Sequence, residues 1–246
     1  MKLSKNKVFI GTSGWSYDHW ADGVFYPKHL TGKDWLSFYS QFFKTVEVNA
    51  CFYHQLTKST YQKWYQITPK DFIFSLKLSR FITHVKKLNQ VSESWHKFIY
   101  PAKSLKEKLG PILVQLPPFL KVNTQKLERL LKLISRHYQV ALEARHPSWF
   151  CQAVFQLLKK YRAALVFAHS RNWVGPQVIT ANFVYLRMHG PEYQYGSDYN
   201  QRSLESLVLK IKNWKKQKLS VYLYFNNDEQ GFAVKNARQL INLVKT

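Results

Sequence analysis

Two of the scarce acidic side chains in this 246-residue sequence stand in or beside short apolar runs. Glu47 lies between Val46 and Val48. Glu143 follows Leu142 at the end of another run. If the valines of the first run face outward, strand alternation points Glu47 inward. A buried carboxylate requires a cation, a metal or a raised pKa, so Glu47 and Glu143 are the predicted acid/base residues.

Cationic side chains occupy corresponding positions in other apolar runs. Lys77 ends one run, Arg145 follows a second and Arg187 ends a third. With the two carboxylates, they predict a polar pocket for acid/base chemistry on an anionic substrate whose charge they neutralise. The alternative is that these acids and cations pair and only fill the interior. Polar and aromatic residues near the same positions complete the predicted substrate-binding set: Trp15, Asn49, Tyr53, Gln115, His146, His189, Tyr199, Asn226 and Asn227.

Other chemistries find less support in the sequence. The histidines near these positions are His84, His146, His169 and His189. With the glutamates they could hold a divalent metal, but no His-Glu-x-x-His or His-x-His spacing occurs, so no metal site is predicted and no cofactor is identified. Cys51 and Cys151 form no motif, and the Gly-x-Ser-x-Gly pattern of a nucleophile elbow is absent. Asn226 and Asn227 could instead cap the last helix.

The charge balance favours anionic partners. The chain has 37 Lys and Arg against 14 Asp and Glu, a formal net charge of +23. Such a charge fits nucleic acid, an acidic membrane surface or a phosphorylated substrate. The alternative is that all proteins of the source organism are rich in lysine, because the lysines are scattered along the chain. Their densest cluster, in residues 210–218, is expected to form the solvated face of one helix.

Composition excludes several classes of protein. At 46% hydrophobic and 16% aromatic residues, the chain can bury a core, which excludes general disorder. No apolar run approaches the roughly 20 residues of a membrane helix, and residues 1–7 lack the apolar stretch of a signal peptide. We therefore expect a soluble, cytoplasmic protein without a membrane partner. The oligomeric state has no signal in the sequence.

The elements that must position these residues alternate in type. Strand-like runs cover residues 8–11, 45–49, 72–77, 112–116, 140–143, 164–168, 183–187 and 221–225, and helical patterns fill most gaps, one of them after the expected N-cap Thr124. Eight strands in about 250 residues predict a TIM-barrel-like (β/α)₈ domain over residues 1–246, with its site at the carboxyl ends of the strands. A doubly wound open sheet is the competitor, but its Gly-x-Gly-x-x-Gly fingerprint is absent. The short gap over residues 169–182, which contains Gly175-Pro176, predicts an irregular or missing helix after the sixth strand.

Many of these motifs, in order, resemble one known family. They lie at residues 10–17, 25–27, 45–49, 52–53, 74–77, 82–84, 109–111, 115–118, 143–146, 148–149, 187–190 and 224–227. The sequence resembles domain-of-unknown-function family 72, also called YecE-like, nearly end to end. The resemblance implies a TIM-barrel-like fold and no established reaction. One departure is His169, because relatives commonly carry an acid after the sixth strand.

Three functional hypotheses follow. The leading one is an enzyme, of hydrolase or isomerase/lyase type, that acts on a phosphorylated sugar or a nucleic-acid component at the barrel mouth. The second is a non-catalytic nucleic-acid-binding protein that uses its basic surface and exposed aromatic residues. The third is a degenerate barrel that serves as a protein-interaction scaffold, which a closed mouth without a pocket would favour.

Overall fold

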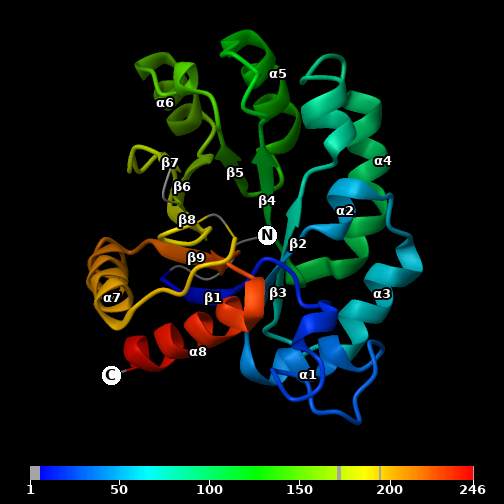
Figure 1. The fold of residues 1–246 in the computed structure, drawn as a ribbon. Helices are drawn as coiled ribbons and strands as arrows, with labels where there is room; N and C mark the ends of the chain where they lie inside the picture. The colour runs from blue at the N-terminus through cyan, green and yellow to red at the C-terminus, as the bar shows by residue number, and fades with distance from the viewer. Residues whose placement is uncertain (1–5, 171–172, 194, 246) are drawn as a thin grey trace.

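Parallel strands form the wall of a nearly closed barrel, surrounded by helices (Figure 1). The computed structural model describes residues 6–170, 173–193 and 195–245. Within them, eight parallel strands follow the order β1-β9-β8-β6-β5-β4-β3-β2. Their bounds are β1 Val8–Thr12, β2 Thr45–Val48, β3 Ile73–Lys77, β4 Leu109–Gln115, β5 Val140–Glu143, β6 Ala164–Ser170, β8 Phe183–Met188 and β9 Ser220–Phe225. The TIM-barrel-like fold predicted from the sequence is confirmed.

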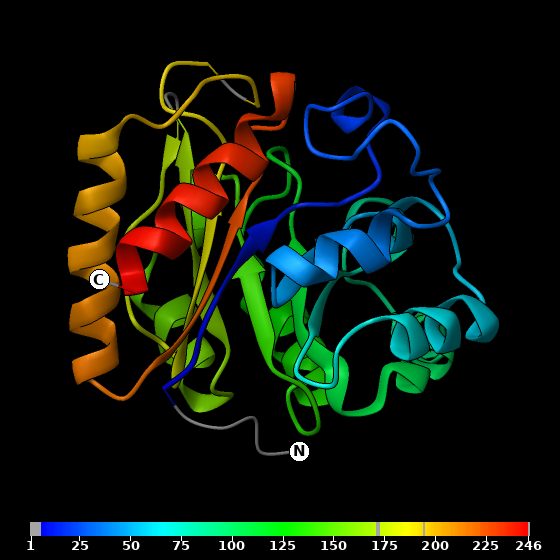
Figure 2. The ribbon, with the colours of Figure 1, turned by 90° about the horizontal axis from the view of Figure 1, so that it is seen from below.

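Helices follow most strands and cover the outside of the barrel (Figure 2). They are α1 Trp35–Phe42, α2 Ala50–Tyr53, α3 Lys58–Ile67, α4 Ser92–Ala102, α5 Thr124–Ile134, α6 Gln152–Lys160, α7 Gln201–Lys216 and α8 Phe232–Lys245. Short helical turns lie at Asp18–Trp20, Phe81–Val85, Lys103–Lys108, Pro147–Trp149 and Glu229–Gly231. Among the helices of the described chain, none is both long enough and apolar enough to cross a membrane.

One predicted helix start is wrong by a single residue. The N-cap of α5 is Asn123, whose side-chain oxygen accepts a hydrogen bond from the backbone N–H of Lys126 at 2.9 Å. Thr124, the predicted cap, is already the first residue of the helix. Both residue types can cap a helix, and the extended backbone of Asn123 decides between them.

The connection after β6 departs from the repeating pattern, as predicted. The residues described between β6 and β8 contain no helix, and the short strand β7 (Trp173–Val174) instead pairs antiparallel with the end of β6. The returning segment is held by Thr180, whose hydroxyl accepts from the N–H of Leu165 at 2.9 Å and donates to the carbonyl of Ala163 at 2.7 Å. A single threonine thus anchors this segment against β6.

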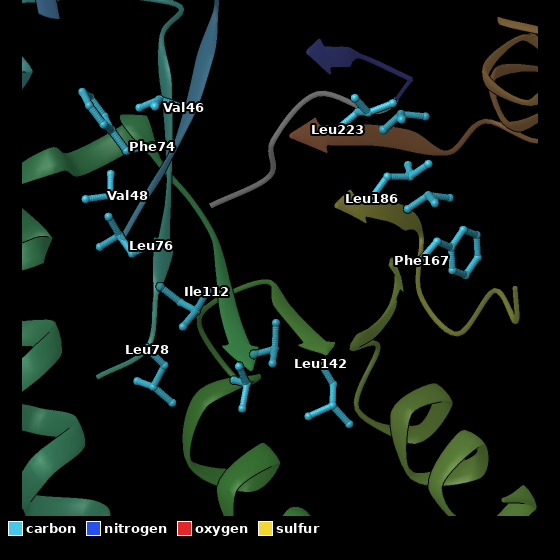
Figure 3. Close-up of a cluster of buried hydrophobic side chains, with 14 of the residues drawn as sticks. Val46, Val48, Phe74, Leu76, Leu78, Ile112, Leu142, Phe167, Leu186 and Leu223 are labelled. Atoms are coloured by element: carbon cyan, nitrogen blue, oxygen red, sulfur yellow. The ribbon is translucent and has the colours of Figure 1, made fainter. Parts of the chain in front are cut away.

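Alternation along the strands divides their side chains between two faces. Figure 3 shows Val46 and Val48 on the outer side of β2, where they belong to the core between strands and helices. Glu47 therefore points into the barrel, as the conditional prediction required. The interior holds a second apolar cluster that includes Phe9, Leu113 and other buried side chains.

The barrel has a seam between its first two strands. No strand ladder joins β1 to β2 in the described chain, although the two lie side by side. The Tyr39 hydroxyl bridges them: it accepts from the N–H of Thr12 at 3.0 Å and donates to the carbonyl of Thr45 at 3.0 Å. A Cβ added at Gly11 would stand 2.2 Å from that Thr45 oxygen. Glycine is thus what permits the close approach.

Candidate functional site: a cationic pocket at the barrel mouth

A cavity of about 540 Å³ opens at the carboxyl ends of the strands. Its lining consists of Gly14, Trp15, Ser16, Tyr17, Val48, Asn49, Ala50, Tyr53, Trp64, Lys77, Gln115, Arg145, Arg187, Tyr195 and Asn226. Among these described residues three are cationic and none is a carboxylate. Cavities of roughly 300–1,000 Å³ are typical of small-molecule sites. The pocket is therefore large enough for a small ligand, and its charge favours an anion.

Arg187, at the end of β8, holds the buried centre of the site together. Its Nε lies 3.1 and 3.0 Å from the two carboxylate oxygens of Glu47, and its Nη2 donates to Oε1 of the same residue at 2.8 Å. Its Nη1 donates to Oε2 of Glu143 at 2.6 Å. Burial alone would lower the pKa of Arg187, but Glu143 and Glu47 hold that pKa above its ordinary value. The guanidinium is therefore a fixed positive charge.

Glu47, from β2, is completely buried and fully hydrogen-bonded. Besides Arg187, the hydroxyl of Ser13 donates to its Oε1 at 2.8 Å, and the hydroxyl of Tyr185 donates to its Oε2 at 2.7 Å. Burial, followed by the Glu47 charge, raises the pKa of Tyr185, which keeps the phenol protonated as a donor. These donors hold the carboxylate in the position where it binds Arg187.

Glu143, at the end of β5, has cations on two sides. Arg145 Nε donates to its Oε1 at 3.2 Å, while Arg187 binds the other oxygen. Burial raises its pKa, but Arg187 leads the opposing contributions, and the net pKa lies well below the usual range of a glutamate. Glu143 is therefore an ionised acceptor at neutral pH.

His189 lies beneath the pocket next to Glu143. Asn226 Nδ2 donates to its Nδ1 at 3.0 Å, so the ring proton belongs on Nε2. That nitrogen lies 3.5 Å from Oε1 of Glu143. Burial lowers the pKa of His189, which leaves the ring neutral in this orientation. Its placement thus connects the pocket residue Asn226 to the buried carboxylate.

Lys77 is the cation of the pocket without a charged partner. Its side chain is only 8% exposed, and its Nζ lies 4.1 Å from the centre of the Phe52 ring. Among the described residues, Nζ has no carboxylate within salt-bridge distance and no hydrogen-bond acceptor. Burial, then the charge of Arg187, lowers the pKa of Lys77 to about 8, although Glu143 and Glu47 oppose the shift. This amine can therefore gain or lose a proton near neutral pH.

Aromatic side chains form one wall of the pocket. The Trp15 ring meets Trp64 of α3 edge to face, with ring centres 4.9 Å apart. Tyr53, at the end of α2, is 65% exposed at the rim. Rings in this arrangement can stack on the flat or apolar face of a ligand. The pocket thus combines an apolar wall with a cationic one.

The predicted site residues separate into three groups. Eight of them line the pocket: Trp15, Asn49, Tyr53, Lys77, Gln115, Arg145, Arg187 and Asn226. Glu47, Glu143 and His189 lie beneath it, in contact with Arg187 or with one another. The remaining three, His146, Tyr199 and Asn227, lie away from the pocket lining.

The three outlying residues have hydrogen-bond partners outside the pocket lining. His146 accepts from the N–H of Ser148 at 3.1 Å, which starts a helical turn. The Tyr199 hydroxyl contacts Nδ1 of His169 at 3.0 Å. Asn227 donates to the carbonyl of Ser197 at 2.8 Å, so its amide fixes a loop rather than capping the last helix. The departure at His169 therefore falls outside the pocket lining.

Sequence reasoning missed three aromatic side chains of the pocket. Tyr17 and Tyr195 lie in the loops after β1 and β8, where position alone could have indicated them. Trp64 lies within α3, away from any strand end, so the sequence offered no signal for it. No three His, Cys, Asp or Glu side chains of the described chain converge as metal ligands.

The fold and this pocket define a TIM-barrel-like protein with a cationic, aromatic-walled mouth. Within that class, the family model described as "Protein of unknown function DUF72" matches residues 9–246. The chain belongs to the DUF72 family, which confirms the resemblance drawn from its motifs.

Relatives match this chain over nearly its whole length. UPF0759 protein YunF of Bacillus subtilis (strain 168) is 27% identical over 96% of this chain and 94% of that protein. The crystal structure of a DUF72 family protein from Thermotoga maritima MSB8 gives a TM-score of 0.86 at 26% identity, covering 98% of this chain and 100% of that chain. A DUF72 family protein from Enterococcus faecalis V583 shares the fold, with a TM-score of 0.82 at 20% identity over 97% of this chain and 96% of that one.

Proposed function

We propose that the mouth pocket binds a small anionic molecule, a phosphorylated sugar or a nucleic-acid component, and performs acid/base chemistry on it. The observation that carries this proposal is the separation of charges across the site. Lys77, Arg145 and Arg187 line the pocket, while Glu47 and Glu143 lie buried behind Arg187. A ligand therefore meets the cations without meeting the carboxylates.

The geometry gives the charged residues different roles in this proposal. Arg145 and Arg187 bind and orient the anionic group. Lys77 transfers the proton, because its pKa of about 8 matches a base or acid that works near neutral pH. Glu47 and Glu143, the acid/base residues expected from the sequence, act by positioning Arg187. The reaction is of hydrolase or isomerase/lyase type.

Phosphate binding tests the pocket directly. Arg145→Met is expected to weaken the binding of inorganic phosphate about 10- to 100-fold, because a hydrogen bond to a charged group contributes roughly 1.5–3 kcal/mol. Isothermal titration calorimetry measures the change. Arg129→Met, on the exposed face of α5, is the matched control and should bind as the parent does. Equal affinity in both variants would refute the proposed anion site.

The pH dependence of anion binding should report Lys77. Because its pKa is lowered from 10.5 to about 8, the ammonium charge is present below pH 8 and is lost as pH rises through that value. Sulfate keeps its charge across this range, so its affinity should fall roughly tenfold, about 1.4 kcal/mol, between neutral and alkaline pH. In Lys77→Met the affinity should be lower and nearly constant with pH. A fall of the same size in the variant would assign the titration to another group.

Non-catalytic nucleic-acid binding is the second candidate. The observation in its favour is exposed aromatic rings near cations, as where Lys87 Nζ lies 5.5 Å from the centre of the Phe119 ring, a side chain that is 62% exposed. This function predicts binding of a single-stranded oligonucleotide that falls steeply with salt and survives Lys77→Met and Arg145→Met. Weak oligonucleotide binding that does not change with salt concentration would exclude this second function. The open pocket gives no support to a closed-mouth scaffold.

A further inference from the structure

We propose that Lys77 is a covalent residue whose amine forms an imine with the substrate, so that the pocket takes an anionic aldehyde or ketone. This inference rests on the proposed anion site, gives Lys77 imine formation in place of proton transfer, and names the substrate class more closely. It starts from the position of one amine. Lys77 lines the same cavity as Arg145 and Arg187, and its Nζ lies 4.1 Å from the centre of the Phe52 ring.

Among the described residues, the other buried lysine, Lys108, has a structural role. Lys108 donates to the carbonyls of Tyr65 and Thr68 at 2.6 and 2.7 Å and to the Thr68 hydroxyl at 3.1 Å, which occupies its ammonium group. Lys77 has no such acceptors among the described residues. The Lys77 amine is therefore available to a ligand in the cavity. The Lys108 ammonium group is already hydrogen-bonded at the end of α3.

The surroundings of Lys77 favour the neutral, nucleophilic amine. Burial is the main cause of the lowered pKa of Lys77, and the charges of Arg187 and Arg145 act in the same direction. With a pKa of about 8, half of the Lys77 side chains carry a free amine at pH 8. An ordinary lysine, whose pKa is about 10.4, is less than about 1% unprotonated at that pH. Lysines activated in this way form imines with carbonyl substrates.

The arginines also place a ligand for this reaction. If they hold the anionic group of the substrate, a carbonyl carbon a few bonds away can reach Nζ in a cavity of about 540 Å³. The anion then offsets the positive charge of a protonated imine. The step requires no redox partner: the nitrogen forms a double bond to the carbonyl carbon, the C=O bond breaks, and the oxygen leaves as water with both amine hydrogens. The neutral imine then takes up one proton from solvent to become the protonated form.

Reductive trapping tests the inference with a defined probe. Pyridoxal 5′-phosphate carries an aldehyde, a ring and a phosphate, and sodium borohydride converts its imine irreversibly to a secondary amine. At pH 8, peptide mass spectrometry should show Lys77 modified at least about tenfold faster than Lys44, an exposed lysine paired with Asp71. Excess inorganic phosphate should protect Lys77, and pyridoxal, which lacks the phosphate, should label it more slowly.

Lys77→Arg provides the matched variant, since it keeps the charge but cannot form the imine. It should lose the adduct at this position and retain phosphate binding, which also shows that it folds. If phosphate binds in an Arg145-dependent manner while Lys77 labels no faster than Lys44, the imine is refuted and the proposed anion site survives. If phosphate neither binds nor protects, the proposed function itself fails.

Discussion

Arg187→Met is expected to lower the free energy of unfolding by about 3–5 kcal/mol, because it leaves buried Glu47 without a cation and removes one of the two cations of Glu143. Arg187 contacts both Glu47 and Glu143, and all three side chains are at most 1% exposed. Domains of this kind are stable by only about 5–15 kcal/mol, so the loss takes a large share of the total. Urea unfolding followed by tryptophan fluorescence measures it.

Two further variants separate this explanation from a general loss of packing. Arg145→Met changes the same residue type in the same pocket, but Glu143 keeps Arg187 as a partner, so the expected cost is about 1 kcal/mol or less. Adding Glu47→Gln and Glu143→Gln to Arg187→Met should restore part of the stability, since no buried charge then lacks a partner. The explanation is wrong if Arg187→Met costs no more than Arg145→Met.

The second large effect is expected at the seam between β1 and β2. Gly11→Ala should destabilise the protein by about 2–3 kcal/mol, because its Cβ would collide with the backbone oxygen of Thr45 and force the strands apart. Thermal and urea unfolding measure the loss. Gly32→Ala is the matched control: a Cβ added there meets nothing within 4 Å, so its stability should be nearly unchanged. Equal effects of the two variants would exclude the steric origin.

Local pattern was enough to predict the strands, but it assigned the inward side of β2 only on the condition that the valines face outward. Outward-facing Val46 and Val48 require Glu47 to face the interior, and the cations at strand ends converge on one pocket because parallel strands end at one rim. The sequence pattern does not predict how deep each side chain lies below the pocket surface. Glu143 and Arg187 both stand at the ends of apolar runs, so the sequence predicts the same depth for both. In the structure, Arg187 lines the pocket and Glu143 lies beneath it.

Loop residues were harder to predict than strand residues for a related reason. His146, Tyr199 and Asn227 follow strands, as the pocket residues do, but their hydrogen-bond partners lie outside the pocket lining. The direction of a loop side chain depends on the loop's irregular backbone conformation. The periodic sequence patterns of strands and helices do not predict that conformation. Trp64 shows the converse, since an aromatic ring inside a helix reaches the pocket through the packing of α3 against the Trp15 loop.

The seam also sets an order of events during synthesis of the chain. In the described chain, β2, β3, β4, β5, β6 and β8 can each pair with a strand that is close in sequence, while β1 pairs only with β9. When the first strand leaves the ribosome, its hydrogen-bonding partner, Ser220–Phe225, does not yet exist. The wall can therefore assemble progressively from its second strand onward. We expect its first strand to enter last, when β9 has emerged and the Tyr39 hydroxyl can join Thr12 to Thr45.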